Sequence, residues 1–130
     1  MRRQAREIAL QILFQAEFAP QISLSTFLEV YEDTFQPESL KYAELLIEGV
    51  QEHKEAIDAA IQAHTRHWKM DRMATVDRNI LRISVFEMKF SSENLKPHMA
   101  INEAVEIAKK YSTAESASFI NGVLDQIGKA

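Results

Sequence analysis

Apolar residues recur along most of the chain at spacings of three and four, which is the period of an amphipathic helix. This pattern predicts helices over residues 3–18, 24–31, 76–90 and, as a pair joined by a polar turn, 98–127. A longer helical pattern begins at Pro37, and its apolar phase slips near His53, so it is either two helices in tandem or one kinked helix. Every stripe has the helical period. The predicted fold class is therefore all-α, with about seven helices and no sheet.

Several single residues carry expectations about local structure. Ser112 to Glu115 spells S-x-x-E, the capping-box pattern that supplies partners for the free amides at a helix start. Thr75 is placed to cap the helix over residues 76–90. Gly122 lies inside the last apolar stripe, where glycine costs about 1 kcal/mol relative to alanine, so we expect another backbone to pack closely there. The single tryptophan, Trp68, is expected to be a buried structural anchor.

Composition places the chain among ordinary globular proteins. Its 130 residues are 46% hydrophobic and 26% charged, which suits one domain with a proper core and is too apolar for a disordered chain. The absence of cysteine excludes disulfides, thiolate catalysis and zinc–thiolate sites. The N-terminus lacks the apolar stretch of a signal peptide, and no apolar run approaches the ~20 residues of a membrane helix. A cytoplasmic protein that does not contact a membrane is the simplest interpretation.

Charge is distributed unevenly, which matters more than the net value of −4. Residues 1–16 hold three arginines and one acid, residues 17–58 hold ten acids and two lysines, and residues 59–130 hold ten basic residues and eight acids. A polyanion would be repelled by the middle of the chain but could bind both ends if these meet in space.

One face of the first predicted helix combines basic and aromatic residues. At about 100° per residue, Arg3, Arg6, Leu10 and Phe14 fall together, apart from the main apolar stripe. Such a strip is typical of single-stranded RNA binding, in which guanidinium groups meet phosphates and a ring stacks on a base. The alternative is that Leu10 and Phe14 pack on a neighbouring helix while the arginines are solvated. Periodicity alone leaves both interpretations open.

Motifs for catalysis or metal binding are not found. The sequence has no glycine-rich phosphate loop, no nucleophile elbow and no cluster of histidines and carboxylates at ligand spacing. His64 and His67 stand three residues apart, but no third ligand is in register with them. We therefore predict that the protein is not an enzyme and binds neither a metal ion nor a cofactor.

Three stretches resemble the NusB family of bacterial transcription antitermination factors, and they occur in the family's order. They are RRQAREIALQILFQ near the N-terminus, the segment from Trp68 to Met88, and INEAVEIAKKYSTAESASFINGVLDQI near the C-terminus, together roughly half of the chain. The resemblance implies two small helical bundles, over about residues 1–66 and 67–130, in one RNA-binding domain. It also implies binding to the boxA element of nascent ribosomal RNA leaders together with NusE, a protein of the small ribosomal subunit, within an RNA polymerase antitermination complex.

The resemblance also implies which residues make these contacts. The RNA surface would comprise Arg2, Arg3, Arg6, Phe14, Lys109, Lys110, Glu115, Ser116 and Phe119. Glu115 would either accept hydrogen bonds from base amino groups or only cap its helix, and both roles stay open. Asp71 and Asp77 match acidic positions that contact NusE in the family, although Asp77 also suits the dipole at a helix start. Only three arginines stand near the N-terminus, fewer basic residues than family members often have, which would weaken binding to RNA alone.

Two other functions and two assembly states stay open. NusB-like folds also occur as the N-terminal domain of ribosomal RNA cytosine methyltransferases, and such an enzyme would be expected to continue into a large cofactor-binding domain beyond Ala130. The chain could alternatively be a helical interaction protein with no RNA partner. The protein is expected to be either a monomer or a homodimer. In a homodimer, the apolar residues of the strip on the first predicted helix would be buried between the two subunits.

Overall fold

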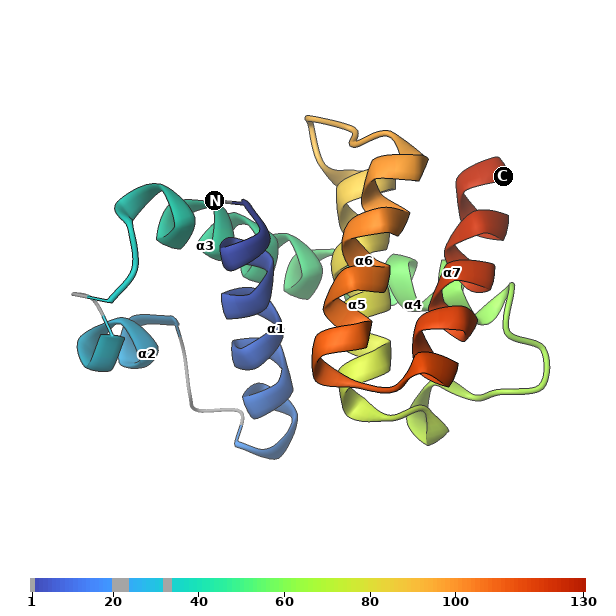
Figure 1. Cartoon of the computed structure of the whole chain (residues 1–130), viewed down its shortest axis with the longest axis horizontal. Coiled ribbons are helices and arrows are strands. Elements are labelled where there is room, and N and C mark those ends of the chain that lie inside the picture. Colours follow the sequence, from blue (N-terminus) through green and yellow to red (C-terminus); the bar gives the residue numbers. More distant parts are fainter. Residues whose placement is uncertain (1, 20–23, 32–33) are drawn as a thin grey trace.

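The computed structural model describes residues 2–19, 24–31 and 34–130, and within these ranges the chain is mostly helical with no strand. Seven α-helices follow one another (Figure 1): α1 (Arg2–Phe18), α2 (Leu24–Tyr31), α3 (Pro37–Glu52), α4 (Lys54–Gln62), α5 (Thr75–Val85), α6 (Pro97–Tyr111) and α7 (Ala114–Lys129). A short 3₁₀ turn, η1 (Met70–Arg72), precedes α5, and a π-helical turn, η2 (Phe86–Phe90), extends it. The predicted fold class and number of helices are confirmed.

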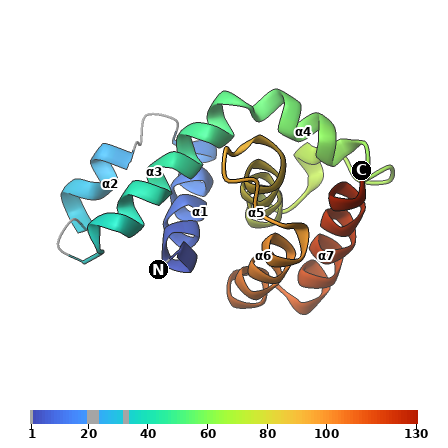
Figure 2. The same ribbon diagram turned by 90° about the horizontal axis from the view of Figure 1, so that it is seen from above.

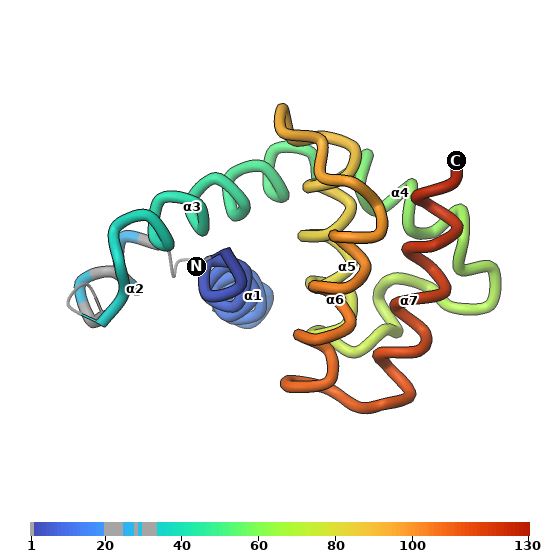
Figure 3. The backbone as a smooth tube through the Cα atoms, turned by 45° about the horizontal axis from the view of Figure 1, so that its top comes forward, coloured from blue at the N-terminus to red at the C-terminus, as the bar shows by residue number. Residues whose placement is uncertain are grey.

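Helix α5 lies at the centre of the molecule, where it packs against α1, α4, α6 and α7. Helices α1 and α3 pair on one side of it with α2 beyond them, and α6 and α7 form a hairpin on the other side (Figures 1 and 2). Helices α3 and α4 follow one another in an arc that joins the two sides (Figure 3). Buried side chains from both sides form one hydrophobic cluster, so the division into bundles near residue 66 stays a prediction.

The predicted apolar stripes form this core. Helix α1 buries five side chains of its predicted stripe, namely Ala5, Ile8, Ala9, Ile12 and Leu13, while the sixth, Ala16, is only partly buried. Leu10 is buried too, because α1 packs against both α3 and α5 and so presents a wider arc to apolar neighbours. For Leu10, the interpretation that it packs on a neighbouring helix is therefore correct.

The phase slip near His53 marks a break between two helices in tandem, since α3 ends and α4 begins on either side of this residue. The His53 ring stacks on that of Phe90, with 5.1 Å between their centres. One turn earlier, Gly49 faces the ring of Phe86, and a Cβ atom at this glycine would lie 2.2 Å from that ring. The missing side chain lets α3 approach η2 this closely.

Several expectations about single residues are wrong. Gly122 faces open space, with nothing within 4 Å of a Cβ atom placed there. Trp68 lies in the loop before η1 and is 57% exposed. Thr75 is the first residue of α5, and Ala74 holds the cap position. The cap of α7 is Thr113, whose hydroxyl accepts a hydrogen bond from the Ser116 amide at 3.0 Å, so the predicted capping box begins one residue too early.

The last turn of the predicted helix over residues 76–90 widens into η2. The Ser91 amide donates to the Phe86 carbonyl, five residues back, at 2.8 Å, and the Leu95 amide donates to the Glu87 carbonyl at 2.9 Å. Turns of this kind often occur at functional sites. Here the turn carries the buried side chain of Glu87, which reaches α1.

Glu17, near the end of α1, ties this helix to the central helix α5. Its carboxylate accepts hydrogen bonds from Arg78, Asn79 and Arg82 of α5. Arg82 also donates to Asp58 of α4 at 2.8 Å. Burial raises the pKa of Glu17, but the hydrogen bonds from Arg78 and Asn79 and the two positive charges outweigh it, so the pKa lies below its ordinary value of 4.5.

This lowered pKa predicts how stability depends on pH. Because folded Glu17 binds its proton less tightly than unfolded Glu17, its carboxylate stabilises the fold above pH 4.5, and the contribution is lost as the pH falls below that value. We expect the Glu17→Gln variant to be less stable than the wild type near pH 7 and to lose less stability between about pH 5 and pH 3. Denaturant unfolding at each pH measures both quantities. An equal pH dependence in the two proteins would show that this carboxylate is not linked to folding.

Candidate nucleic-acid interface

The first two arginines lie about half exposed at the start of α1, and each pairs with an acid from the other side of the molecule. Arg2 donates to Glu93 at 2.7 Å and lies 4.2 Å from the ring centre of Tyr42. Arg3 donates to Glu103 of α6 at 2.8 Å. The hydrogen bond to Glu93 raises the pKa of Arg2, and the hydrogen bond to Glu103 raises that of Arg3. Both guanidinium groups are therefore charged and accessible where α1 meets its neighbours.

Arg6 is not on this surface, which corrects the prediction that it meets RNA. It is 5% exposed, and its Nε and Nη2 atoms donate to the two carboxylate oxygens of Glu87 at 2.8 and 2.9 Å. The Tyr42 hydroxyl donates to the same carboxylate at 2.6 Å. Burial lowers the pKa of Arg6, but the hydrogen bond and charge of Glu87 outweigh burial, so the pKa lies above its ordinary value. Burial and the same carboxylate both raise the pKa of Tyr42. A guanidinium this enclosed holds α1 against η2 and cannot neutralise a phosphate.

The end of α6 carries two exposed lysines, and one of them, Lys110, contacts α1. Lys110 donates to Glu7 of α1 at 3.0 Å, and Lys109 lies 3.2 Å from Glu106, one turn earlier in α6. The Tyr111 hydroxyl donates to the same Glu7 oxygen at 2.6 Å. The basic N-terminal segment and basic residues from the C-terminal part of the chain therefore meet in space.

A groove of about 410 Å³ lies between α1, the start of α5 and the end of α6. It is lined by Glu7, Leu10, Gln11, Phe14, Gln15, Val76 and Tyr111. Phe14 is partly buried here, with its ring centre 5.2 Å from that of Phe18. The groove therefore combines two aromatic rings with two amide side chains, and single-stranded RNA binding uses such rings to stack bases.

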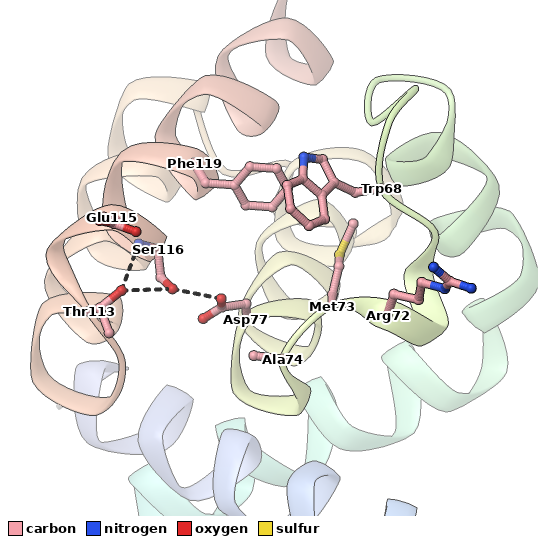
Figure 4. A pocket seen from close by; sticks show the side chains of 9 residues that line it. All are labelled: Trp68, Arg72, Met73, Ala74, Asp77, Thr113, Glu115, Ser116 and Phe119. Atoms are coloured by element: carbon pink, nitrogen blue, oxygen red, sulfur yellow. Dashed lines mark hydrogen bonds between the residues drawn. The ribbon is translucent and has the colours of Figure 1, made fainter.

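A smaller cleft of about 250 Å³ lies at the start of α5, between η1 and α7 (Figure 4). It is lined by Trp68, Arg72, Met73, Ala74, Asp77, Thr113, Glu115, Ser116 and Phe119. The rings of Trp68 and Phe119 meet edge to face, with 6.4 Å between their centres. The structure thus brings the three predicted α7 residues to one cleft with an aromatic wall.

Trp68 and Tyr111 are aromatic residues of these two hollows that the sequence-based prediction of the site missed. Each stands directly beside a lysine in the sequence, Lys69 and Lys110, and that pairing of a ring with a cation is a signal for nucleic-acid binding. Trp68 was assigned to the core because a lone tryptophan is usually buried. Tyr111 was assigned to the core because it ends an apolar stripe with the helical period.

Glu115 lies in the first turn of α7 with its side chain exposed. Since Thr113 and Ser116 make the cap contacts of this helix, the interpretation of Glu115 as a capping residue is wrong. An exposed carboxylate beside the cleft can accept hydrogen bonds from base amino groups.

The two acids predicted to contact a protein partner have different environments. Asp77 is 8% exposed, and its two oxygens accept hydrogen bonds from the hydroxyls of Ser112 and Ser116 at 2.8 and 2.7 Å. It therefore ties the start of α5 to the turn between α6 and α7, and its predicted contact with NusE stays a prediction. Asp71 is exposed on η1.

Across residues 2–19, 24–31 and 34–130, no group of three or more histidines and acids is placed to hold a metal ion. Over the same ranges, the structure contains no helix with the length and apolar character needed to span a membrane.

Comparison with known proteins decides the family. The sequence profile of the NusB family matches residues 3–129. The chain belongs to the NusB family. Over 129 residues it is 64% identical to the transcription antitermination protein NusB of Bdellovibrio bacteriovorus, covering 99% of this chain and 96% of that protein. It is 39% identical over 138 residues to the NusB of Myxococcus xanthus, covering 99% and 95% of the two chains.

Solved NusB structures share the fold over nearly the whole chain. NusB of T. maritima is 34% identical with a TM-score of 0.88, covering 99% of this chain and 91% of that one. A chain from a crystal structure of the antitermination factors NusB and NusE in complex with dsRNA is 31% identical with a TM-score of 0.83, covering 98% and 96%. The resemblance inferred from the three sequence stretches is confirmed.

Proposed function

We propose that this protein acts in transcription antitermination by binding boxA-type single-stranded RNA together with NusE, a protein of the small ribosomal subunit. The observation that carries the proposal is the similarity, at a TM-score of 0.83, to a chain from the complex of NusB, NusE and dsRNA. The Bdellovibrio relative, 64% identical, is a transcription antitermination protein. The protein would act in the cytoplasm as a non-enzymatic part of an RNA polymerase antitermination complex.

The proposed RNA surface comprises residues of the groove and the cleft together with exposed cations at the start of α1 and the end of α6. It combines four cations, two rings and two polar α7 residues: Arg2, Arg3, Lys109, Lys110, Phe14, Phe119, Glu115 and Ser116. The cations would neutralise phosphates, the rings would stack on bases, and Glu115 would accept hydrogen bonds from base amino groups. Arg6 would support this surface from inside the fold.

A salt-dependent titration with boxA-type RNA tests this function. We expect binding that weakens as salt rises, that favours boxA over a scrambled strand of equal length, and that is tighter when NusE is present. A double-stranded arm belongs in the experiment because the similar NusB–NusE structure contains dsRNA. Equal affinity for scrambled RNA would reduce the function to unspecific binding, and no RNA binding with or without NusE would favour an interaction protein without an RNA partner.

Asp71 is the residue that we propose for direct contact with NusE. Its turn, η1, is held in place because Arg78 donates to the Met73 carbonyl at 2.8 Å and the Met70 amide donates to Gln62 at 3.0 Å. The exposed carboxylate is therefore presented from a fixed position. A ribosomal protein is expected to be basic, and acids at the rim of an interface speed association more than they increase affinity. Asp77 would shape the same region through its serine contacts.

The Asp71→Asn variant is expected to associate with NusE roughly two- to fivefold more slowly at low salt. Its thermal stability and its direct binding to RNA should stay unchanged, because the side chain is exposed on η1. Stopped-flow association at two salt concentrations measures the effect. The matched control is Asp125→Asn, which removes the same charge from α7. If the control slows association equally, only net charge matters and the NusE contact lies elsewhere.

A further inference from the structure

One carboxylate oxygen where α1 meets α6 accepts hydrogen bonds from two donors on the other helix. The Glu7 Oε1 atom accepts from Lys110 Nζ at 3.0 Å and from the Tyr111 hydroxyl at 2.6 Å, and these residues lie 103 and 104 positions away in the sequence. Lys110 Nζ also lies 5.3 Å from the centre of the Tyr111 ring. The ammonium and the phenol thus form a compact pair of donors at the exposed end of α6.

We infer that Lys110 and Tyr111 form a subsite for one RNA backbone phosphate and that Glu7 occupies this subsite in the RNA-free protein. An ammonium and a hydroxyl that converge on one anionic oxygen can bind a phosphate oxygen in the same way. The carboxylate has the same sign of charge and uses the same donors. This inference rests on the proposed RNA function and adds Tyr111 and Glu7 to its binding surface.

The position of the pair suits a phosphate next to a stacked base. Glu7 and Tyr111 line the same groove as Phe14. The hydrogen bond to Glu7 raises the pKa of Lys110, and burial together with that carboxylate raises the pKa of Tyr111. Both groups therefore keep their protons near neutral pH and donate to either anion.

Other cations of the proposed surface are paired in the same manner: Arg2 with Glu93, Arg3 with Glu103 and Lys109 with Glu106. At each cation, an RNA phosphate must therefore displace the carboxylate that is already bound. The displaced carboxylate stays nearby and repels the strand. This exchange lowers the affinity for RNA alone and makes binding depend on further contacts. Glu7 is the most informative case because two donors from another helix meet on one of its oxygens.

The Glu7→Gln variant tests the subsite because it preserves the shape of the side chain and removes the competing charge. We expect boxA-type RNA to bind about two- to fivefold more tightly at low salt, the range for breaking an exposed ion pair. The dependence of log affinity on log salt should steepen by about 0.7, which corresponds to one phosphate of a single strand. The matched control is Asp125→Asn, which frees Lys129 on α7 from an equivalent pair at 3.0 Å and should leave RNA binding unchanged.

The decisive comparison repeats Glu7→Gln in a Lys110→Ala background, where the gain should disappear, and in a Tyr111→Phe background, where it should shrink. An equal gain in the Lys110→Ala background would show that Glu7 acts only by long-range repulsion and would overturn the subsite, as would no gain in the wild-type background. Circular dichroism establishes that each variant is folded. If the wild type binds RNA and Glu7→Gln does not change the affinity, only the subsite is overturned. If neither the wild type nor any variant binds RNA, the proposed function is overturned as well.

Discussion

The Arg6→Ala variant is expected to lose about 3–5 kcal/mol of unfolding free energy. The substitution leaves the Glu87 carboxylate, whose side chain is 2% exposed, buried without the guanidinium that binds both of its oxygens. A buried charge that loses its partner keeps the full penalty of leaving water. Denaturant unfolding near neutral pH measures the loss.

The matched control for this variant breaks an ion pair that is exposed to solvent on the protein surface. Lys129→Ala removes the pair with Asp125 one turn away on α7, at 3.0 Å, and should change stability by less than about 0.5 kcal/mol. If Arg6→Ala were as stable as the wild type but bound RNA more weakly, Arg6 would return to the RNA surface and its pairing with Glu87 would be dispensable.

Helix positions and most core residues were predictable because apolar side chains must return to the same face at each turn, and that period is local in sequence. The slip near His53 was readable for the same reason: two helices in tandem cannot keep one apolar phase. Leu10 shows where a single stripe fails. A helix that packs against two neighbours buries a wider arc than its main stripe, and nothing local tells how many neighbours it has.

Contacts between distant residues explain the other misses. Arg6 falls on the helix face of Arg3, but its burial depends on Glu87, 81 positions away on a turn whose π-helical shape is not evident from periodicity. The α7 cap depends on a similar choice: Ser112 and Thr113 are both good capping residues, and Asp77 of α5 binds Ser112, which leaves Thr113 to cap. Local patterns could not rank these alternatives.

The residues of the proposed RNA surface came from family resemblance as much as from chemistry. Periodicity placed Phe14 beside the arginines of α1, but only the resemblance joined it to Lys110 and to Phe119 of α7. The structure supplies a physical reason for that grouping, since Glu7 links α1 to the end of α6 and Asp77 links α5 to the turn before α7. Tyr111 was missed because an aromatic residue at helical spacing is usually part of a core.

The Phe119→Ala variant is expected to weaken binding of boxA-type RNA by about 1–3 kcal/mol, the range for a base stacked on an aromatic side chain. The ring is partly buried against the core and forms one wall of the cleft with Trp68. Fluorescence titration in the presence of NusE measures the affinity. The control is Met99→Ala, which removes an exposed apolar side chain of α6 that lines neither the groove nor the cleft.

Because Phe119 also packs on the core, a second substitution separates stacking from packing. Phe119→Leu keeps an apolar side chain beside Trp68 but offers no ring to a base. If the ring stacks on a base, the Phe119→Leu variant should bind RNA nearly as weakly as the Phe119→Ala variant. Its unfolding free energy should nevertheless stay closer to that of the wild type. Restored RNA affinity with leucine would mean that Phe119 only shapes the cleft, and the stacking surface would then be Trp68, the more exposed ring of the pair.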